Sequence, residues 1–221
     1  MEIKDMINML FSGTGETLLM VLFSTIFGYI IGLPLGILLT VTAKDGIRPN
    51  PVIYKIADLI INITRSIPFL ILLILIQPFT KLIVGKSYGT TATIVPLTVA
   101  AAPFIARMVE NSLKEVDKGV IEAAFSMGAS PFTIISKVLV AEAKTSLLVG
   151  ITIALGTVIG YSAMAGIIGG GGLGDIAIRY GYYRYETKIM IITVVVLVIL
   201  MQILQWAGML LARKVDRRRG N

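Results

Sequence analysis

The chain has 221 residues, with 20 lysines and arginines against 13 aspartates and glutamates, and it contains neither histidine nor cysteine. Charged residues make up only 15% and hydrophobic residues 56%, whereas a soluble globular domain carries about 25% charged residues. This composition indicates a membrane protein rather than a water-soluble monomer. The missing cysteines and histidines exclude disulfides, thiolate chemistry, the usual zinc and haem sites, and any histidine-based catalytic relay.

Long uncharged runs predict where the chain crosses the bilayer. A hydrocarbon core of about 30 Å needs roughly 20 helical residues. Four runs without any charge meet this length, and a fifth is interrupted only by Arg65, whose cost of about 3 kcal/mol the surrounding aliphatic residues can offset. We therefore expect one all-α membrane domain over residues 1–221. Its five expected spans are 17–43, 59–80, 87–107, 143–168 and 189–212.

Five spans place the two chain ends on opposite sides of the membrane. With this topology, thirteen lysines and arginines fall on the side of the C-terminus and six on the side of the N-terminus. The positive-inside rule makes the first side cytoplasmic. We expect the N-terminus outside, the C-terminus inside, and the basic segment 213–219 at the inner leaflet rather than on nucleic acid.

Two glycine-containing segments superficially match nucleotide-binding motifs. Residues 85–87 read Gly-Lys-Ser, but Thr80 stands where a phosphate-binding loop requires its first glycine. Residues 169–174 match the dinucleotide fingerprint, but they follow a membrane helix instead of a strand. The sequence thus predicts no ATPase, no enzymatic activity and no cofactor in this chain.

The connection over residues 113–137 is the longest one on the expected cytoplasmic side. Its apolar residues recur at helical spacing, with Val120 and Ala124 on one face. Gly128 follows at a position suited to a sharp turn. We expect a short amphipathic helix, which can lie on the membrane or insert into a groove on another protein.

This connection carries a recognisable motif: Glu122, Ala123 and Ala124, followed three residues later by Gly128. It resembles the coupling loop of permeases from binding-protein-dependent ABC importers. The resemblance implies that the segment docks on a cytosolic ATPase subunit, which supplies ATP and Mg. The family's usual motif ends in a proline, and here Ala141 stands at that place.

Further segments resemble the methionine branch of these permeases. They are residues 65–69, 94–98, 101–107, 160–166, 170–175 and 178–182. The resemblance covers nearly the whole chain. It implies a bacterial inner-membrane permease for D- and L-methionine that works with a second copy of itself, two ATPase subunits, an extracytoplasmic methionine-binding protein and the lipid bilayer.

Tyr161, Ser162 and Met164 lie late in the fourth expected span, before the glycine-rich break. One interpretation is that they line the translocation path or its gate, where the polarizable Met164 could close the passage or contact a thioether. The alternative is that the small residues here only allow close helix packing.

The remaining site candidates are structural or face the binding protein. Arg65 is either a snorkelling charge or one member of an ion pair, and Pro68 follows it where a kink is expected. Gly171 and Gly174, with Asp175 and Arg179, would form an outer connection that faces the binding protein.

Three other functions remain open at this stage. The nearest is a permease for another amino acid or small polar solute with the same architecture. A secondary carrier is disfavoured, because acidic groups near the middle of a span are not evident. A non-transport structural or assembly protein is the third.

Overall fold

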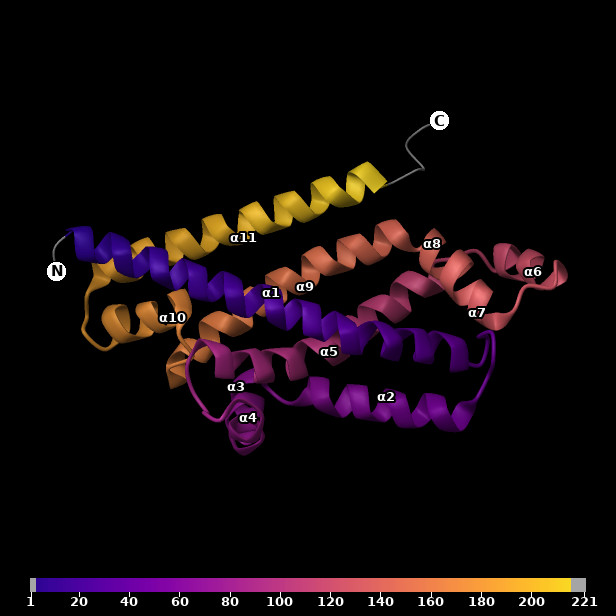
Figure 1. Ribbon diagram of the computed structural model, residues 1–221, viewed down its shortest axis with the longest axis horizontal. Coiled ribbons are helices and arrows are strands. Elements are labelled where there is room, and N and C mark those ends of the chain that lie inside the picture. Colours follow the sequence, from indigo (N-terminus) through magenta and orange to yellow (C-terminus); the bar gives the residue numbers. More distant parts are fainter. Residues whose placement is uncertain (1–2, 216–221) are drawn as a thin grey trace.

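The computed structural model describes residues 3–215, and every regular element in that range is helical, so the all-α prediction is confirmed. The long helices run roughly along one axis, and α4 is seen end-on across it (Figure 1). In chain order they are α1 Ile3–Thr42, α2 Pro51–Ser66, α3 Phe69–Leu75, α4 Gln77–Val84, α5 Thr90–Lys114, α6 Lys118–Ser126, α7 Pro131–Thr133, the π-helical η1 Ile134–Leu139, α8 Val140–Glu142, α9 Lys144–Ala165, the short η2 Gly166–Ile168, α10 Gly172–Ile176, the π-helical η3 Ala177–Tyr182 and α11 Thr187–Val215. The basic tail expected at the inner leaflet is described only up to Val215.

Within residues 3–215, four helices are long and apolar enough to cross a membrane: α1, α5, α9 extended by η2, and α11. The last three overlap the spans expected over 87–107, 143–168 and 189–212. The expected start of the first span at residue 17 is not where its helix starts. Helix α1 begins at Ile3 and has 40 residues, about 60 Å of helix, because Lys4, Asp5 and Glu16 do not interrupt it.

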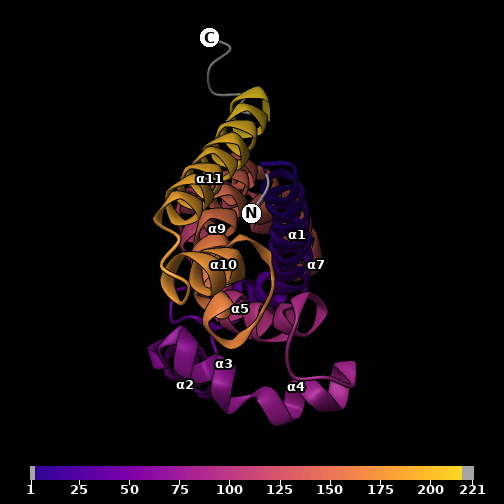
Figure 2. The same ribbon diagram turned by 90° about the vertical axis from the view of Figure 1, so that its left-hand side faces the viewer.

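The span expected over 59–80 is interrupted at Pro68, where a kink was expected. Helices α2 and α3 meet at a bend of 101°, and α4 follows after Ile76. The cause lies in Pro68, which has no backbone N–H and pushes the residue before it out of the helical region. Ile67 accordingly has φ −79° and ψ 122°. Together α2 and α3 are apolar enough to form one broken span or a re-entrant loop, and Figure 2 shows the separate directions of α2, α3 and α4.

Helices α1 and α5 pack closely along a stripe of glycines. A Cβ atom built on Gly32 would lie 2.7 Å from the carbonyl oxygen of Ala102, and one on Gly36 would lie 2.6 Å from that of Ala106. Gly28, one turn earlier, lies against side chains of α5, where a Cβ atom would come within 2.8 Å of Ile105 Cδ1. Small residues four apart let two membrane helices approach to backbone contact. This contact fixes α5, which continues toward the connection over residues 113–137.

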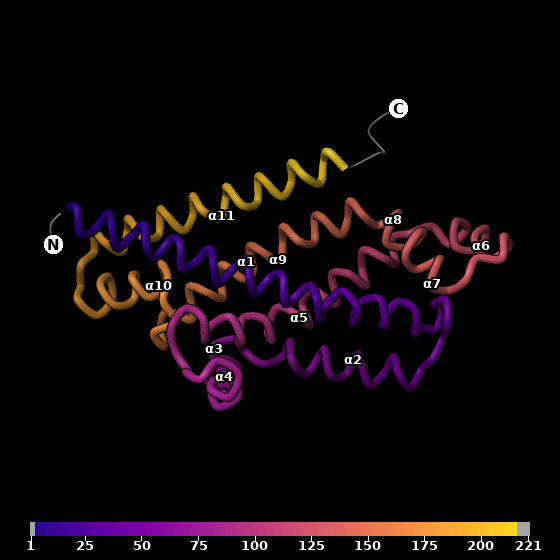
Figure 3. The backbone as a smooth tube through the Cα atoms, viewed as in Figure 1, coloured from indigo at the N-terminus to yellow at the C-terminus, as the bar shows by residue number. Residues whose placement is uncertain are grey.

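The chain path places the connections at two opposite ends of the bundle (Figure 3). Helices α6, α7 and α8 lie at one end, near the loop between α1 and α2. Helix α10 lies at the other end, near the N-terminal part of α1. The core between them contains buried side chains from α1, α3, α5 and α9, among them Met20, Leu73, Leu97, Ile105 and Val158.

Candidate functional site

Helix α6 contains the motif and is defined at both ends by hydrogen bonds. At its start the Asp117 side chain accepts a hydrogen bond from the backbone N–H of Gly119 at 2.6 Å. At its end Gly128 has φ +79°, its N–H donates to the carbonyl of Phe125, and the N–H of Ala129 donates to that of Ala124. This pair of bonds is the Schellman motif, which requires a left-handed residue at the position of Gly128. The expected short helix with a glycine turn is therefore present.

The motif residues do not share one environment. Glu122 and Ala123 are exposed, whereas Ala124 is only 5% exposed. Helical spacing places Val120 on the same face as Ala124, but the exposed fraction of Val120 is much larger, at 43%. The exposed apolar side chains around α6 belong to Phe125 and Met127, and to Phe132 in α7. They form an apolar surface open to solvent, which we call the α6 surface.

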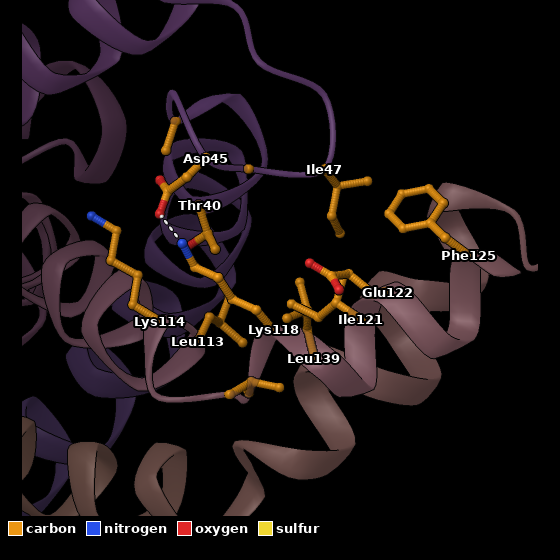
Figure 4. Close-up of a pocket in the computed structure, with 13 residues that line it drawn as sticks. Thr40, Asp45, Ile47, Leu113, Lys114, Lys118, Ile121, Glu122, Phe125 and Leu139 are labelled. Carbon is orange, nitrogen blue, oxygen red and sulfur yellow. Dashed lines mark hydrogen bonds and ion pairs between the residues drawn. The ribbon is translucent and has the colours of Figure 1, made fainter.

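An ion pair joins α6 to the loop between α1 and α2. The Lys118 Nζ lies 3.0 Å from Asp45 Oδ2, and its hydrogen bond lowers the pKa of the Asp45 carboxyl. Behind this pair is a cleft of about 310 Å³, which Glu122 and Phe125 line from α6 and Ile47 lines from the loop (Figure 4). This exposed pair adds to an apolar contact, because Ile47 of the loop and Ile121 of α6 both pack against the core.

The three candidates for the translocation path lie in different surroundings. Tyr161 stacks on Phe69 of α3, with ring centroids 4.6 Å apart and planes 7° from parallel. Ser162 is 2% exposed and donates a hydrogen bond to the carbonyl of Ile159 at 2.8 Å. Met164 is 49% exposed. The structure leaves Met164 and part of Tyr161 accessible, but it does not bring Ser162 to a surface.

The glycine-rich segment is docked on α1. Gly171 and Gly172 have φ of +83° and +74°, which a side chain would oppose. The N–H of Gly172 donates to Glu16 Oε2 at 2.6 Å, and that of Leu173 donates to Thr17 Oγ1 at 2.9 Å. The N–H groups of Gly172 and Leu173 are therefore not free to bind a phosphate, which argues against the nucleotide-binding interpretation. The segment instead attaches α10 to the membrane helices.

The other outer candidates lie in and just after α10. A Cβ atom on Gly174 would collide with the backbone of Ala163 in α9, so a glycine is needed for this close approach. Asp175 and Arg179 form an ion pair at 2.5 Å, in which the Asp175 side chain is 14% exposed and that of Arg179 57%. The four outer candidates therefore share one end of the molecule, and Arg179 is the most accessible of the charged pair.

Arg65 lies in the last turn of α2, immediately before the bend at Pro68. Helix α2 begins at Pro51, 14 residues earlier. Arg65 is exposed and forms no ion pair with any carboxylate in residues 3–215.

A charged cluster between α2 and α5 was missed by the sequence analysis. Glu110 is 2% exposed, and its two oxygens pair with Arg107 at 2.6 Å and Lys114 at 2.8 Å. Arg107 also pairs with Asp58 of α2 and donates a hydrogen bond to Asn62 Oδ1 at 3.0 Å. The spacing of Arg107, Glu110 and Lys114 puts them on one face of α5, which was a signal available in the sequence.

The chain was compared with known proteins. Residues 32–220 match the family model described as "Binding-protein-dependent transport system inner membrane component". The chain belongs to this family. It is thus a permease subunit of an ABC transporter and a multi-pass protein of the bacterial inner membrane.

Relatives with curated names are similar over most of the permease. A protein of Vibrio cholerae named "Probable D-methionine transport system permease protein MetI" is 51% identical over 211 residues, 96% of this chain and 94% of its own length. The "D-methionine transport system permease protein MetI" of Escherichia coli K12 is 53% identical over 163 residues, 74% of this chain and 75% of its own.

Solved structures agree with this assignment. A chain from "Inward facing conformations of the MetNI methionine ABC transporter" has 50% identity, covers 98% of the permease and 100% of itself, and has a TM-score of 0.96. An amino acid ABC transporter structure with histidines has a TM-score of 0.78 at 20% identity, which supports the fold alone. Within the described part of the chain, no group of three acidic, histidine or cysteine residues could hold a metal ion.

Proposed function

We propose that this permease imports methionine, as the D and L forms, in an ATP-driven transporter. The observation that carries the proposal is the similarity to a methionine ABC transporter structure over 98% of the chain, with a TM-score of 0.96. The D-methionine names of relatives at 51% and 53% identity support the same substrate. We assign no catalytic residue to the permease, and ATP and Mg belong to a separate ATPase subunit.

The α6 surface is the proposed site of ATPase coupling. Its exposed apolar side chains, Phe125 and Met127, suit insertion into a groove of another protein. Glu122 and Ala123 are exposed beside them, while Ala124 packs inward and Gly128 ends the helix. In this proposal Glu122 and Ala123 contact the ATPase. Ala124 and Gly128 position and end the helix.

A second copy of the permease completes the passage. Four or five crossings are too few to enclose a polar path, so a two-fold pair with the path at its axis is the simplest closed arrangement. Many apolar side chains on α1, α2 and α11 are exposed in the single chain, including Phe23, Ile60 and Val198. Lipid and the second copy would cover them. Met164 and Tyr161 are the accessible gate candidates.

The opposite end of the molecule is the proposed contact for an extracytoplasmic methionine-binding protein. Arg179, exposed and paired with Asp175, offers charge there, and Gly171 and Gly174 shape its backbone. ATP binding would draw the two α6 helices together and open the passage outward, and hydrolysis would return it. Each ligand must favour one of the two states, or no net motion results.

Uptake of labelled methionine tests the proposal directly. A bacterial strain that lacks its own methionine transporter should regain uptake when it receives the permease, its ATPase and its binding protein. Uptake should stop on ATP depletion and continue when the ion gradient collapses. Loss with the ion gradient alone would indicate a secondary carrier, import of a different amino acid would correct the substrate, and no uptake would contradict a transport function.

Thiol labelling tests the expected orientation, because the chain contains no cysteine. Met127 is 81% exposed at the α6 end, and Tyr88 is 69% exposed in the loop before α5. A membrane-impermeant maleimide added to intact spheroplasts should label Tyr88→Cys and leave Met127→Cys unlabelled until the membrane is opened. The reverse pattern would place α6 outside and remove the coupling proposal.

A further inference from the structure

A small cleft lies at the break between α2 and α3. Its volume is about 130 Å³, and it is lined by Arg65 and Thr64 on the polar side and by Phe69, Phe104 and Tyr161 among its apolar walls. These residues come from α2, α3, α5 and α9, so four segments distant in sequence converge on it. Interrupted membrane helices are where transporters commonly place substrate sites, because a break exposes polar groups at depth.

Arg65 is the polar centre of this cleft. It lies 14 residues beyond the first residue of α2, about 21 Å along the helix axis, so it is deep relative to the α6 end of the molecule. It is exposed and forms no ion pair with the carboxylates of residues 3–215. An unpaired guanidinium facing lipid is costly, so this side chain requires water or an anionic group opposite it.

The opposing walls are rigid and apolar. Phe69 is 7% exposed and stacks on Tyr161 with ring centroids 4.6 Å apart, and Leu72 beneath them is 4% exposed. The edge of an aromatic ring accepts a thioether sulfur, and a guanidinium recognises a carboxylate by two parallel hydrogen bonds. The two sides therefore match the two ends of an apolar amino acid.

We propose that this cleft is a transient binding site for the transported amino acid, in which Arg65 receives its carboxylate and the Phe69–Tyr161 pair contacts its side chain. The inference rests on the proposed function, because it takes methionine as the molecule that passes. It explains why an arginine stands unpaired beside a broken helix. It also makes Arg65 a substrate-binding residue instead of a snorkelling or salt-bridged one.

Protection from thiol labelling tests the site in the purified permease–ATPase complex. Thr64→Cys places a thiol in the cleft of a permease that has no other cysteine, and Ser12→Cys places one at an exposed position on α1, away from the cleft. Millimolar methionine should slow maleimide labelling of Thr64→Cys at least threefold and leave Ser12→Cys unchanged. Methioninol, which keeps the amine and thioether but lacks the carboxylate, should give no protection.

Substitutions of Arg65 complete the test. Adding Arg65→Gln should abolish protection by methionine, and Arg65→Lys should keep part of it, because the charge remains without the paired hydrogen bonds. Thermal unfolding of both complexes should match that of the unmodified complex, which monitors folding. In cells, Arg65→Gln should lower methionine uptake about tenfold or more.

Several results would overturn the site. For Thr64→Cys, these results are no labelling by maleimide, equal labelling with and without methionine, or protection by methioninol. Slower labelling of Ser12→Cys in methionine would also overturn it, as would normal methionine uptake by Arg65→Gln. Uptake by the unmodified transporter separates the two proposals. If it imports methionine but the cleft is not protected, only this site is rejected, and if it imports no methionine, the proposed function itself fails.

Discussion

The contact between α1 and α5 and the attachment of α6 are opposite solutions to holding two segments together. Gly32 brings the backbones so close that a single added Cβ would lie 2.7 Å from a carbonyl oxygen. Helix α6 is held to the adjacent loop by the exposed Asp45–Lys118 pair, and Met127 beside it is 81% exposed. The first contact cannot yield without moving a helix. The second leaves side chains free to contact another protein.

The largest expected effect is at the α1–α5 contact. Gly32→Leu should destabilise the permease by about 3 kcal/mol, because overpacking a dense interface forces backbone shifts, and the nearest atom here is backbone. Thermal unfolding in detergent measures the loss. Gly15→Leu is the matched control on the same helix: a Cβ there meets nothing within 4 Å, so it should cost nothing. Equal losses in both variants would contradict the close contact.

A second comparison contrasts the buried charged cluster with the exposed pair. Glu110→Ala should cost about 2 kcal/mol, because it removes two charge-assisted hydrogen bonds of a side chain that is 2% exposed, while Arg107 keeps its pair with Asp58. Asp45→Ala removes one member of an exposed pair and should cost at most about 1 kcal/mol. The same unfolding measurement checks both. If Glu110→Ala and Asp45→Ala lowered the free energy of unfolding by similarly small amounts, water would have to screen the charges of the cluster.

Sequence reasoning predicted the helices better than their contacts. The uncharged runs and the motif from Glu122 to Gly128 were enough to predict an all-α membrane permease with a short helix in its longest cytoplasmic connection. These features depend on local composition and spacing. Arg107 and Asp58, in contrast, meet across 49 positions of sequence, and periodicity along one helix cannot say which other helix faces it.

The bend after α2 shows a similar limit. Pro68 marked a kink in the sequence, but a proline alone does not set its angle, and the observed 101° depends on how α3 packs against α5 and α9. The same packing gives Arg65 its place beside Phe69 and Tyr161. Ser162 was chosen as a path residue by its neighbours in sequence, whereas its hydroxyl is bonded inside the helix.

The C-terminal turn of α6 gives a smaller effect that should appear mainly in coupling. Gly128→Val places a branched side chain at φ +79°, which costs about 1–2 kcal/mol for the turn. We expect weaker co-purification of the ATPase and a lower ATP hydrolysis rate in response to the loaded binding protein. Gly128→Asn is the control, since asparagine accepts the left-handed conformation, and it should retain most of both. Failure of both variants alike would point to the side chain's size at the interface.

The smallest expected effect is the pH dependence of the α6 attachment. Lys118 lowers the pKa of the Asp45 carboxyl below its usual 3.8, so the folded state favours the ionised form. The ion pair therefore contributes fully above the unfolded value and is lost as pH falls through the lower, folded value. Hydrogen exchange in α6 should rise at that acid limit by no more than about fivefold, equivalent to about 1 kcal/mol. Asp45→Asn should exchange at the raised rate already at neutral pH and show no such step, and a step of equal size in that variant would assign the effect to another group.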